Sequence, residues 1–162
     1  MIIIFSFYYP PVMAPSAFRI LDLTKALLEK KQNKYKNIKI FTAEIDRNLV
    51  KKNIVNNLND KRLEVVRIKV PFKDSNKKNE FANFVVYFFK SIFFTFKLKP
   101  SMILGTSGRL GTNFLAALVG FFKNKPYILD IRDLFAINTQ EIILKNYPIL
   151  GQIFFKVIIN LE

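Results

Sequence analysis

The chain contains no cysteine and no histidine among its 162 residues. Without cysteine, it can form neither disulfides nor thiolate metal sites. Without histidine, it lacks the commonest neutral metal ligand and proton shuttle. Any catalysis by this chain must therefore use carboxylates, hydroxyls, Lys, Arg or Tyr.

Long uninterrupted apolar runs are also absent. The longest apolar stretch, residues 81–98, carries Lys90 near its centre and polar side chains on either side of it, so it does not suit a membrane span. The apolar start, residues 1–10, lacks the basic segment and the small-residue cleavage site of a signal peptide. We therefore expect a cytoplasmic chain without a transmembrane segment.

Acidic residues are scarce beside basic ones. The chain has 26 Lys and Arg against 12 Asp and Glu, which gives a formal net charge of +14. Such an excess favours anionic partners, such as nucleic acid, phospholipid headgroups or phosphorylated substrates. AT-rich codon usage, which raises Lys, Asn, Ile and Phe together, explains the excess equally well. Because no recognised nucleic-acid-binding motif accompanies the charge, we do not expect a nucleic acid partner.

The apolar pattern predicts alternating strands and helices. Short runs rich in β-branched and aromatic residues predict strands at residues 2–7, 38–42, 63–70, 102–104 and 127–131. Helices are predicted at about 17–31, 79–98, 112–122 and 139–145, and from 148 to the end, with Ser16 as the N-cap of the first. The length suits one domain, residues 1–162. The alternation predicts an α/β, Rossmann-like three-layer sandwich with a mainly parallel, doubly wound sheet.

Three segments should share one edge of this sheet, because each follows the carboxyl end of a strand, where such folds bind ligands. The first segment is proline-rich and leads into a helix whose N-terminal amides could face an anion such as a diphosphate. Its candidate binding residues are Pro11, Ala14, Ser16 and Arg19. The alternative is an ordinary strand-to-helix loop that its prolines make rigid.

The second segment follows the strand at residues 102–104 and has glycines at positions 105, 108 and 111. These glycines would let the backbone approach a ligand, and the candidate contacts are Thr106, Ser107 and Arg109. The spacing is neither that of a Walker loop nor that of the dinucleotide fingerprint. The glycines could equally serve only to turn the chain into the next helix.

The third segment places Arg132 between two carboxylates, Asp130 and Asp133. Asp130 belongs to the strand end and is expected to bond loop amides. Arg132 and Asp133 are the candidate catalytic residues, because burial and neighbouring charges would tune groups that point into a cleft. A purely structural Asp/Arg network is an equal alternative, since spacing alone assigns no acid or base role.

Together these segments resemble the N-terminal domain of the retaining family-4 glycosyltransferases of the GT-B fold, especially those that build capsular and O-antigen polysaccharide. The resemblance covers nearly the whole chain. It rests on Pro10-Pro11 with Arg19, on Ile-Leu-Gly-Thr-Ser at 103–107, and on the string Asp-Ile-Arg-Asp-Leu-Phe at 130–135, the most specific element. The chain departs from many relatives at 13–16, where they carry Gly-Gly, and at Phe135, where they carry Trp.

The resemblance implies a domain that binds the acceptor, a lipid-linked saccharide, while its first loop touches the donor phosphates. The nucleotide-sugar donor would be held by a C-terminal domain that this chain lacks, so the isolated chain should be inactive. No metal and no cofactor are implied, and the protein would act at the inner face of the bacterial membrane. A second hypothesis is a non-catalytic module that binds anions or an anionic membrane surface through Lys90, Lys97 and Lys99 beside exposed aromatic residues of the Phe-rich helix.

Overall fold

The structure, a computed structural model, describes residues 1–29, 37–45, 60–72, 77–106 and 110–131. The chain divides into a unit Met1–Asp130 and a second unit, Ile131–Glu162. Only the first unit is described at length, so the helices predicted at 139–145 and after 148 lie outside the described residues.

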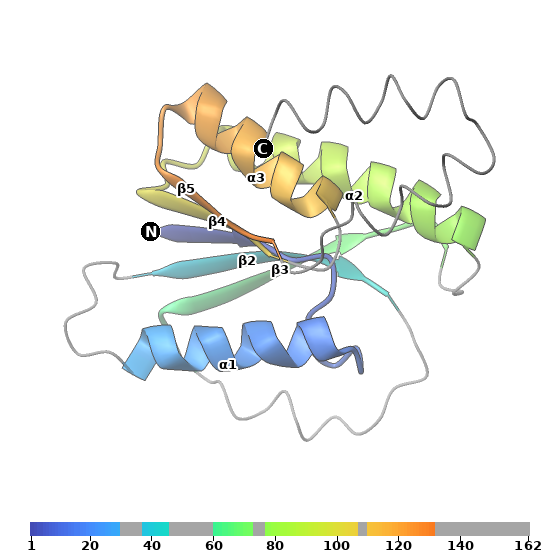
Figure 1. Ribbon diagram of the computed structural model, residues 1–162, viewed down its shortest axis with the longest axis horizontal. Coiled ribbons are helices and arrows are strands. Elements are labelled where there is room, and N and C mark those ends of the chain that lie inside the picture. The colour runs from blue at the N-terminus through green and yellow to red at the C-terminus, as the bar shows by residue number, and fades with distance from the viewer. Residues whose placement is uncertain (30–36, 46–59, 73–76, 107–109, 132–162) are drawn as a thin grey trace. The chain divides into compact units, whose positions relative to one another are not determined.

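The described part of the chain contains a five-stranded sheet in which every pairing is parallel. The strand order is β3-β2-β1-β4-β5, so β1 is central (Figure 1). The strands are β1 (Ile2–Phe5), β2 (Ile38–Glu44), β3 (Leu63–Lys69), β4 (Met102–Thr106) and β5 (Tyr127–Asp130). The predicted α/β class with a parallel sheet is confirmed.

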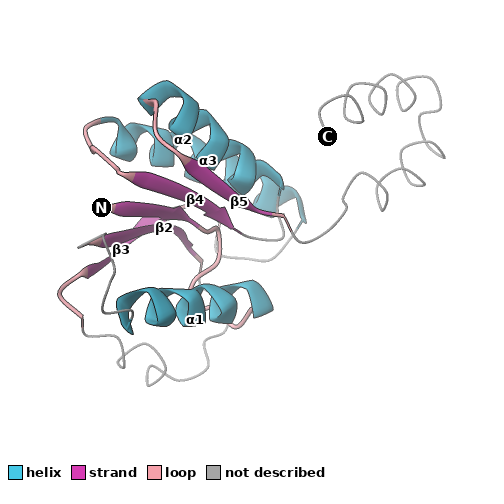
Figure 2. Ribbon diagram, turned by 60° about the vertical axis from the view of Figure 1, so that its left-hand side comes forward, coloured by secondary structure: helices cyan, strands magenta, loops and turns pink. Residues whose placement is uncertain are grey.

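Helices cover both faces of the sheet. One face carries α1 (Pro15–Glu29), and the other carries α2 (Lys77–Phe96) and α3 (Leu110–Lys123), as Figures 1 and 2 show. This arrangement is the three-layer sandwich that the alternation of strands and helices predicted.

The central strand supplies both halves of the core. All four residues of β1 are fully buried, and they alternate between the two faces of the sheet. Ile3 and Phe5 join the cluster under α2 and α3, whereas Ile2 and Ile4 pack with residues of α1. A strand covered on both faces needs a continuous apolar run, which is why the alternation typical of half-exposed strands is missing here.

The start of α1 differs from the prediction. The amide nitrogens of Ala17 and Phe18 both donate to the carbonyl oxygen of Ala14, at 2.9 and 3.3 Å. The helix therefore begins at Pro15, and Ser16 lies in its first turn instead of capping it. The fixed φ of Pro15 suits the first helical position, where no amide hydrogen is needed.

Helix α2 turns its polar side chains towards the sheet. Asn83, Tyr87, Ser91 and Thr95 are all buried, with at most 1% of each residue exposed. Three of these side chains are bonded inside the protein: Asn83 exchanges two hydrogen bonds with the backbone of Phe72, the Tyr87 hydroxyl donates to the carbonyl of Phe41, and the Thr95 hydroxyl donates to the carbonyl of Ser91. The outward face is rich in phenylalanine, which inverts the pattern of an ordinary surface helix.

Among the helices that the structure describes, none combines the length and the hydropathy that a membrane span requires.

Candidate functional site

The loops after β1 and β4 leave the sheet at the same edge. The parallel register aligns Phe5 with Gly105, and Thr106 with Asp130 at the end of β5. The strand order also reverses between β1 and β4. From β1 the chain adds β2 and β3 on one side of it, and then crosses to the other side of β1 to add β4 and β5. Such a reversal point, at the carboxyl ends of the strands, is where open α/β sheets bind their ligands.

The first predicted segment forms a compact loop at this edge. The amide of Val12 donates to the carbonyl of Tyr9 at 3.2 Å, both residues are buried, and the Pro10-Pro11 peptide bond is cis. The predicted binding residues lie in the loop before α1 and in the first turns of this helix. Pro11, Ala14 and Ser16 are partly exposed, and Arg19 is exposed.

An arginine that the sequence did not single out holds this loop. A guanidinium nitrogen of Arg67, near the carboxyl end of β3, donates to the carbonyl of Pro10 at 2.6 Å. Burial lowers the pKa of the Arg67 side chain, against the opposing influence of Tyr9 and Glu44. The available signal was an arginine between the apolar residues Val66 and Ile68 of a predicted strand, but its partner lies 57 residues away in the sequence.

A second connection, also missed, joins the loop to α2. The Tyr8 hydroxyl donates to the carboxylate of Glu80, in the first turn of α2. In the sequence, Glu80 is only one of the polar residues at the start of the helix predicted at 79–98. The loop is thus held from two sides, by β3 through Arg67 and by α2 through Glu80.

Two of the predicted binding residues contact each other. Thr106 is fully buried, and its hydroxyl donates to a carboxylate oxygen of Asp130 at 2.8 Å. The side-chain amide of Asn113, on α3, donates to the backbone carbonyl of Asp130 at 3.2 Å. The end of β5 is therefore fixed from β4 and α3, and the Thr106 hydroxyl is one partner of the Asp130 carboxylate.

Four of the predicted site residues lie outside the described residues: Ser107, Arg109, Arg132 and Asp133. The proposed catalytic pair, Arg132 and Asp133, therefore stays a prediction. Within the described ranges, the structure brings the first loop, Thr106 and Asp130 to one edge of the sheet.

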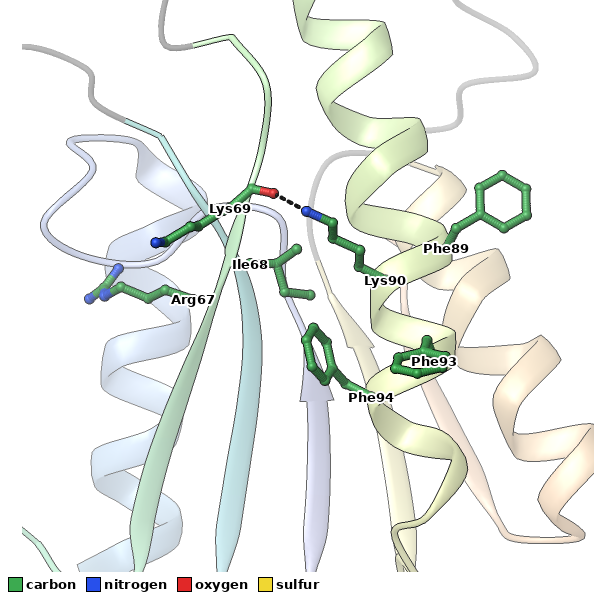
Figure 3. Close-up of a pocket in the computed structure, with 7 residues that line it drawn as sticks. All are labelled: Arg67, Ile68, Lys69, Phe89, Lys90, Phe93 and Phe94. Carbon is green, nitrogen blue, oxygen red and sulfur yellow. Dashed lines mark hydrogen bonds between the residues drawn. The ribbon is translucent and has the colours of Figure 1, made fainter.

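A groove that the sequence did not predict lies beside the outer strand, between β3 and α2 (Figure 3). Its volume is about 640 Å³. Figure 3 shows Phe94 pointing towards Ile68, while the ammonium group of Lys90 reaches the carbonyl of Lys69 at 2.9 Å. The lining residues are Arg67, Ile68, Lys69, Phe89, Lys90, Phe93 and Phe94. We call this feature the β3–α2 groove.

Across the described ranges, no three Asp or Glu side chains lie close enough together to hold a metal ion. No protein-family model matches the chain, and a comparison with curated proteins finds no match. Its function must therefore be inferred from its own residues and their arrangement.

Proposed function

We propose that this chain is the N-terminal, acceptor-binding half of a GT-B glycosyltransferase of the retaining family-4 type. The complete enzyme would transfer a sugar from a nucleotide sugar to a lipid-linked saccharide during surface polysaccharide synthesis. The observation that carries the proposal is the meeting of the first loop, Thr106 and Asp130 at the reversal point of the parallel sheet.

The groups at this edge suit a phosphorylated saccharide. Sugar hydroxyls donate hydrogen bonds, and carboxylate oxygens such as those of Asp130 accept them. The bond from Thr106 fixes the orientation of that carboxylate. The N-terminus of α1 and the exposed Arg19 offer an anion site for a diphosphate through their positive charge, since a helix N-terminus carries partial positive charge even though the amides of Ala17 and Phe18 bond the carbonyl of Ala14.

The rest of the enzyme would lie in the C-terminal domain that the resemblance implies. That domain would hold the nucleotide sugar, and the transfer would need neither a metal nor a cofactor. Because the acceptor is attached to lipid, the enzyme would work in the cytoplasm, at the inner face of the bacterial membrane. No role is proposed for nucleic acid.

The isolated chain should bind the acceptor without transferring sugar to it. Transfer requires the donor and the acceptor to be oriented against each other between two domains, and orientation supplies much of the barrier reduction. Equilibrium dialysis with a short-chain prenyl-diphosphate monosaccharide should detect binding. Radiolabelled nucleotide sugars added to the same mixture should give no product above a buffer control. Turnover by the isolated chain would contradict this division of labour.

Replacing Thr106 with valine should weaken that binding about five-fold, because one oriented hydrogen bond contributes about 1 kcal/mol and 1.4 kcal/mol corresponds to a factor of ten. Valine keeps the shape of the side chain but removes the donor to Asp130. The matched control is Thr95→Val, since Thr95 is also buried but bonds the carbonyl of Ser91 on α2. Equal losses in both variants would place the acceptor site elsewhere.

A further inference from the structure

The outward face of α2 presents a continuous stripe of phenylalanine. Phe81, Phe89, Phe93 and Phe96 are between 65% and 78% exposed, and Val85 fills the gap in the stripe. The spacing of four, four, four and three residues keeps these side chains on one side of the helix. The stripe extends over about 22 Å, at 1.5 Å per residue. We call it the α2 phenylalanine stripe.

The stripe is exposed although α2 packs against the sheet through another of its faces. The helix has a buried stripe, and that stripe contains Asn83, Tyr87, Ser91 and Thr95. Residues two positions apart lie about 200° apart around a helix, so Phe81 and Asn83 point in nearly opposite directions. The buried side thus holds Asn83, Ser91, Thr95 and the ring of Tyr87, whereas the phenylalanine rings of the stripe lie on the open side. A large exposed apolar surface of this kind marks an interaction site.

The surroundings of the stripe are cationic. No Asp or Glu occurs from residue 81 to residue 129, whereas this stretch contains six Lys and Arg residues. Within the described part of this stretch, the exposed lysines are Lys90, Lys97, Lys99 and Lys125. The opposite face of the sheet differs, because α1 carries two basic and two acidic residues: Arg19, Asp22, Lys25 and Glu29. Among the described residues, the stretch around the stripe thus carries only positive charge, whereas α1 carries both signs equally.

We propose that this face binds the surface of an anionic lipid bilayer, with α2 lying in the plane of the membrane. The rings of the α2 phenylalanine stripe would enter the boundary between headgroups and acyl chains, and the lysines would contact lipid phosphates. Helices that lie in a membrane surface combine an aromatic face with flanking Lys and Arg in this way. A second copy of the chain suits this face less well, because a symmetric pair would place lysines opposite lysines.

The β3–α2 groove extends the same surface. Phe89 and Phe93 belong both to the α2 phenylalanine stripe and to the groove lining, and Lys90 crosses the groove towards β3 (Figure 3). Aromatic walls beside ammonium groups suit a phospholipid, whose phosphate is anionic and whose chains are apolar. The groove therefore adds a place where a single lipid headgroup can be held.

Membrane binding by α2 would also position the first loop, through the bond between Tyr8 and Glu80. This consequence rests on the proposed function, but the membrane inference does not. The membrane inference is tested with vesicles that carry no saccharide. If the chain does not bind these vesicles, the proposed acceptor site is not affected.

The chain contains no tryptophan, so one introduced at the stripe reports on its surroundings alone. In Phe93→Trp, the emission should shift to the blue when vesicles of phosphatidylethanolamine and phosphatidylglycerol are added. Leu23→Trp, on the opposite face, is the matched control and should show no shift. Vesicles of phosphatidylcholine alone should produce at least ten-fold weaker binding.

Two sets of substitutions separate the contributions of rings and charges. Phe89→Ser with Phe93→Ser should weaken binding to the anionic vesicles at least ten-fold, because each buried ring contributes through its apolar area. Lys90→Gln with Lys97→Gln should weaken it roughly thirty-fold at low salt, from about 1 kcal/mol for each lysine near an anionic surface. Lys25→Gln, on α1, should leave binding unchanged.

The inference is overturned if the Phe93→Trp emission does not move, or if both vesicle types bind equally. It is also overturned if sedimentation shows a dimer that Phe93→Ser dissociates while vesicles do not bind, since the stripe would then be an interface between copies. A shift at position 93 that needs anionic lipid supports it.

Discussion

Replacing Gly105 with alanine is expected to lower the free energy of unfolding by about 2–3 kcal/mol. Gly105 lies in β4, next to the central strand and beneath α3. A methyl group added there would lie 2.6 Å from the Cβ of Ala116 and 3.1 Å from the Cα of Asn113. Neither atom can swing aside as the tip of a long side chain would, so α3 must move away from the sheet. Chemical denaturation of both proteins measures the difference.

A second substitution tests whether the cause is this contact. Ala116→Gly removes the nearest atom, and alone it should cost about 1 kcal/mol because glycine is a poor helix former. Combined with Gly105→Ala, it should recover about 1 kcal/mol relative to the sum of the two single effects. If the two changes in the free energy of unfolding simply added, the close packing of β4 against α3 would not be the reason why a side chain at position 105 is destabilising.

Asn83→Leu is expected to destabilise the protein by about 2–3 kcal/mol, although it places an apolar residue at a buried position. The side-chain oxygen of Asn83 accepts from the amide of Phe72 at 3.0 Å, and its amide nitrogen donates to the carbonyl of Phe72 at 2.7 Å. Leucine removes both hydrogen bonds, and each of them contributes about 0.5–1.5 kcal/mol. Thermal unfolding followed by circular dichroism measures the loss.

The matched substitution on the outer face should have little effect on stability. Phe93 is 77% exposed, so Phe93→Asn should change the free energy of unfolding by no more than about 0.5 kcal/mol. In most surface helices, replacing a phenylalanine by asparagine would be the more destabilising change, and replacing an asparagine by leucine the less destabilising one. If Phe93→Asn proved the more destabilising of the two, the inverted orientation of α2 would be wrong.

The sheet could be predicted because its strands are dictated by local sequence. An unbroken run such as Ile2 to Phe5 can only be accommodated where both faces are covered, which indicates a central parallel strand. Apolar residues at helical spacing between such runs then predict helices that cross from strand to strand. For the same reason, Thr106 and Asp130 could be assigned to one edge, since the carboxyl ends of parallel strands meet there.

The orientation of α2 could not be predicted. Its sequence contains an apolar stripe and a polar stripe, both at helical spacing, and periodicity does not say which of them faces the sheet. The orientation is determined by hydrogen-bond partners in distant segments. One of them is the carbonyl of Phe41, which accepts a hydrogen bond from the Tyr87 hydroxyl, 46 residues away in the sequence. Arg67 escaped prediction for the same reason, because its bond to Pro10 exists only after β3 has joined the sheet.

The most direct test of the account is to map acceptor binding residue by residue. In ¹⁵N-labelled protein, adding the prenyl-diphosphate monosaccharide should shift the amide resonances of Ala14, Ser16, Thr106 and Asp130, which lie at the carboxyl edge of the sheet. Amides at the opposite edge, such as those of Leu98 and Ser101, should stay in place. The proposed function is contradicted if the ligand shifts only the opposite edge, or if saturating ligand shifts no resonance at all.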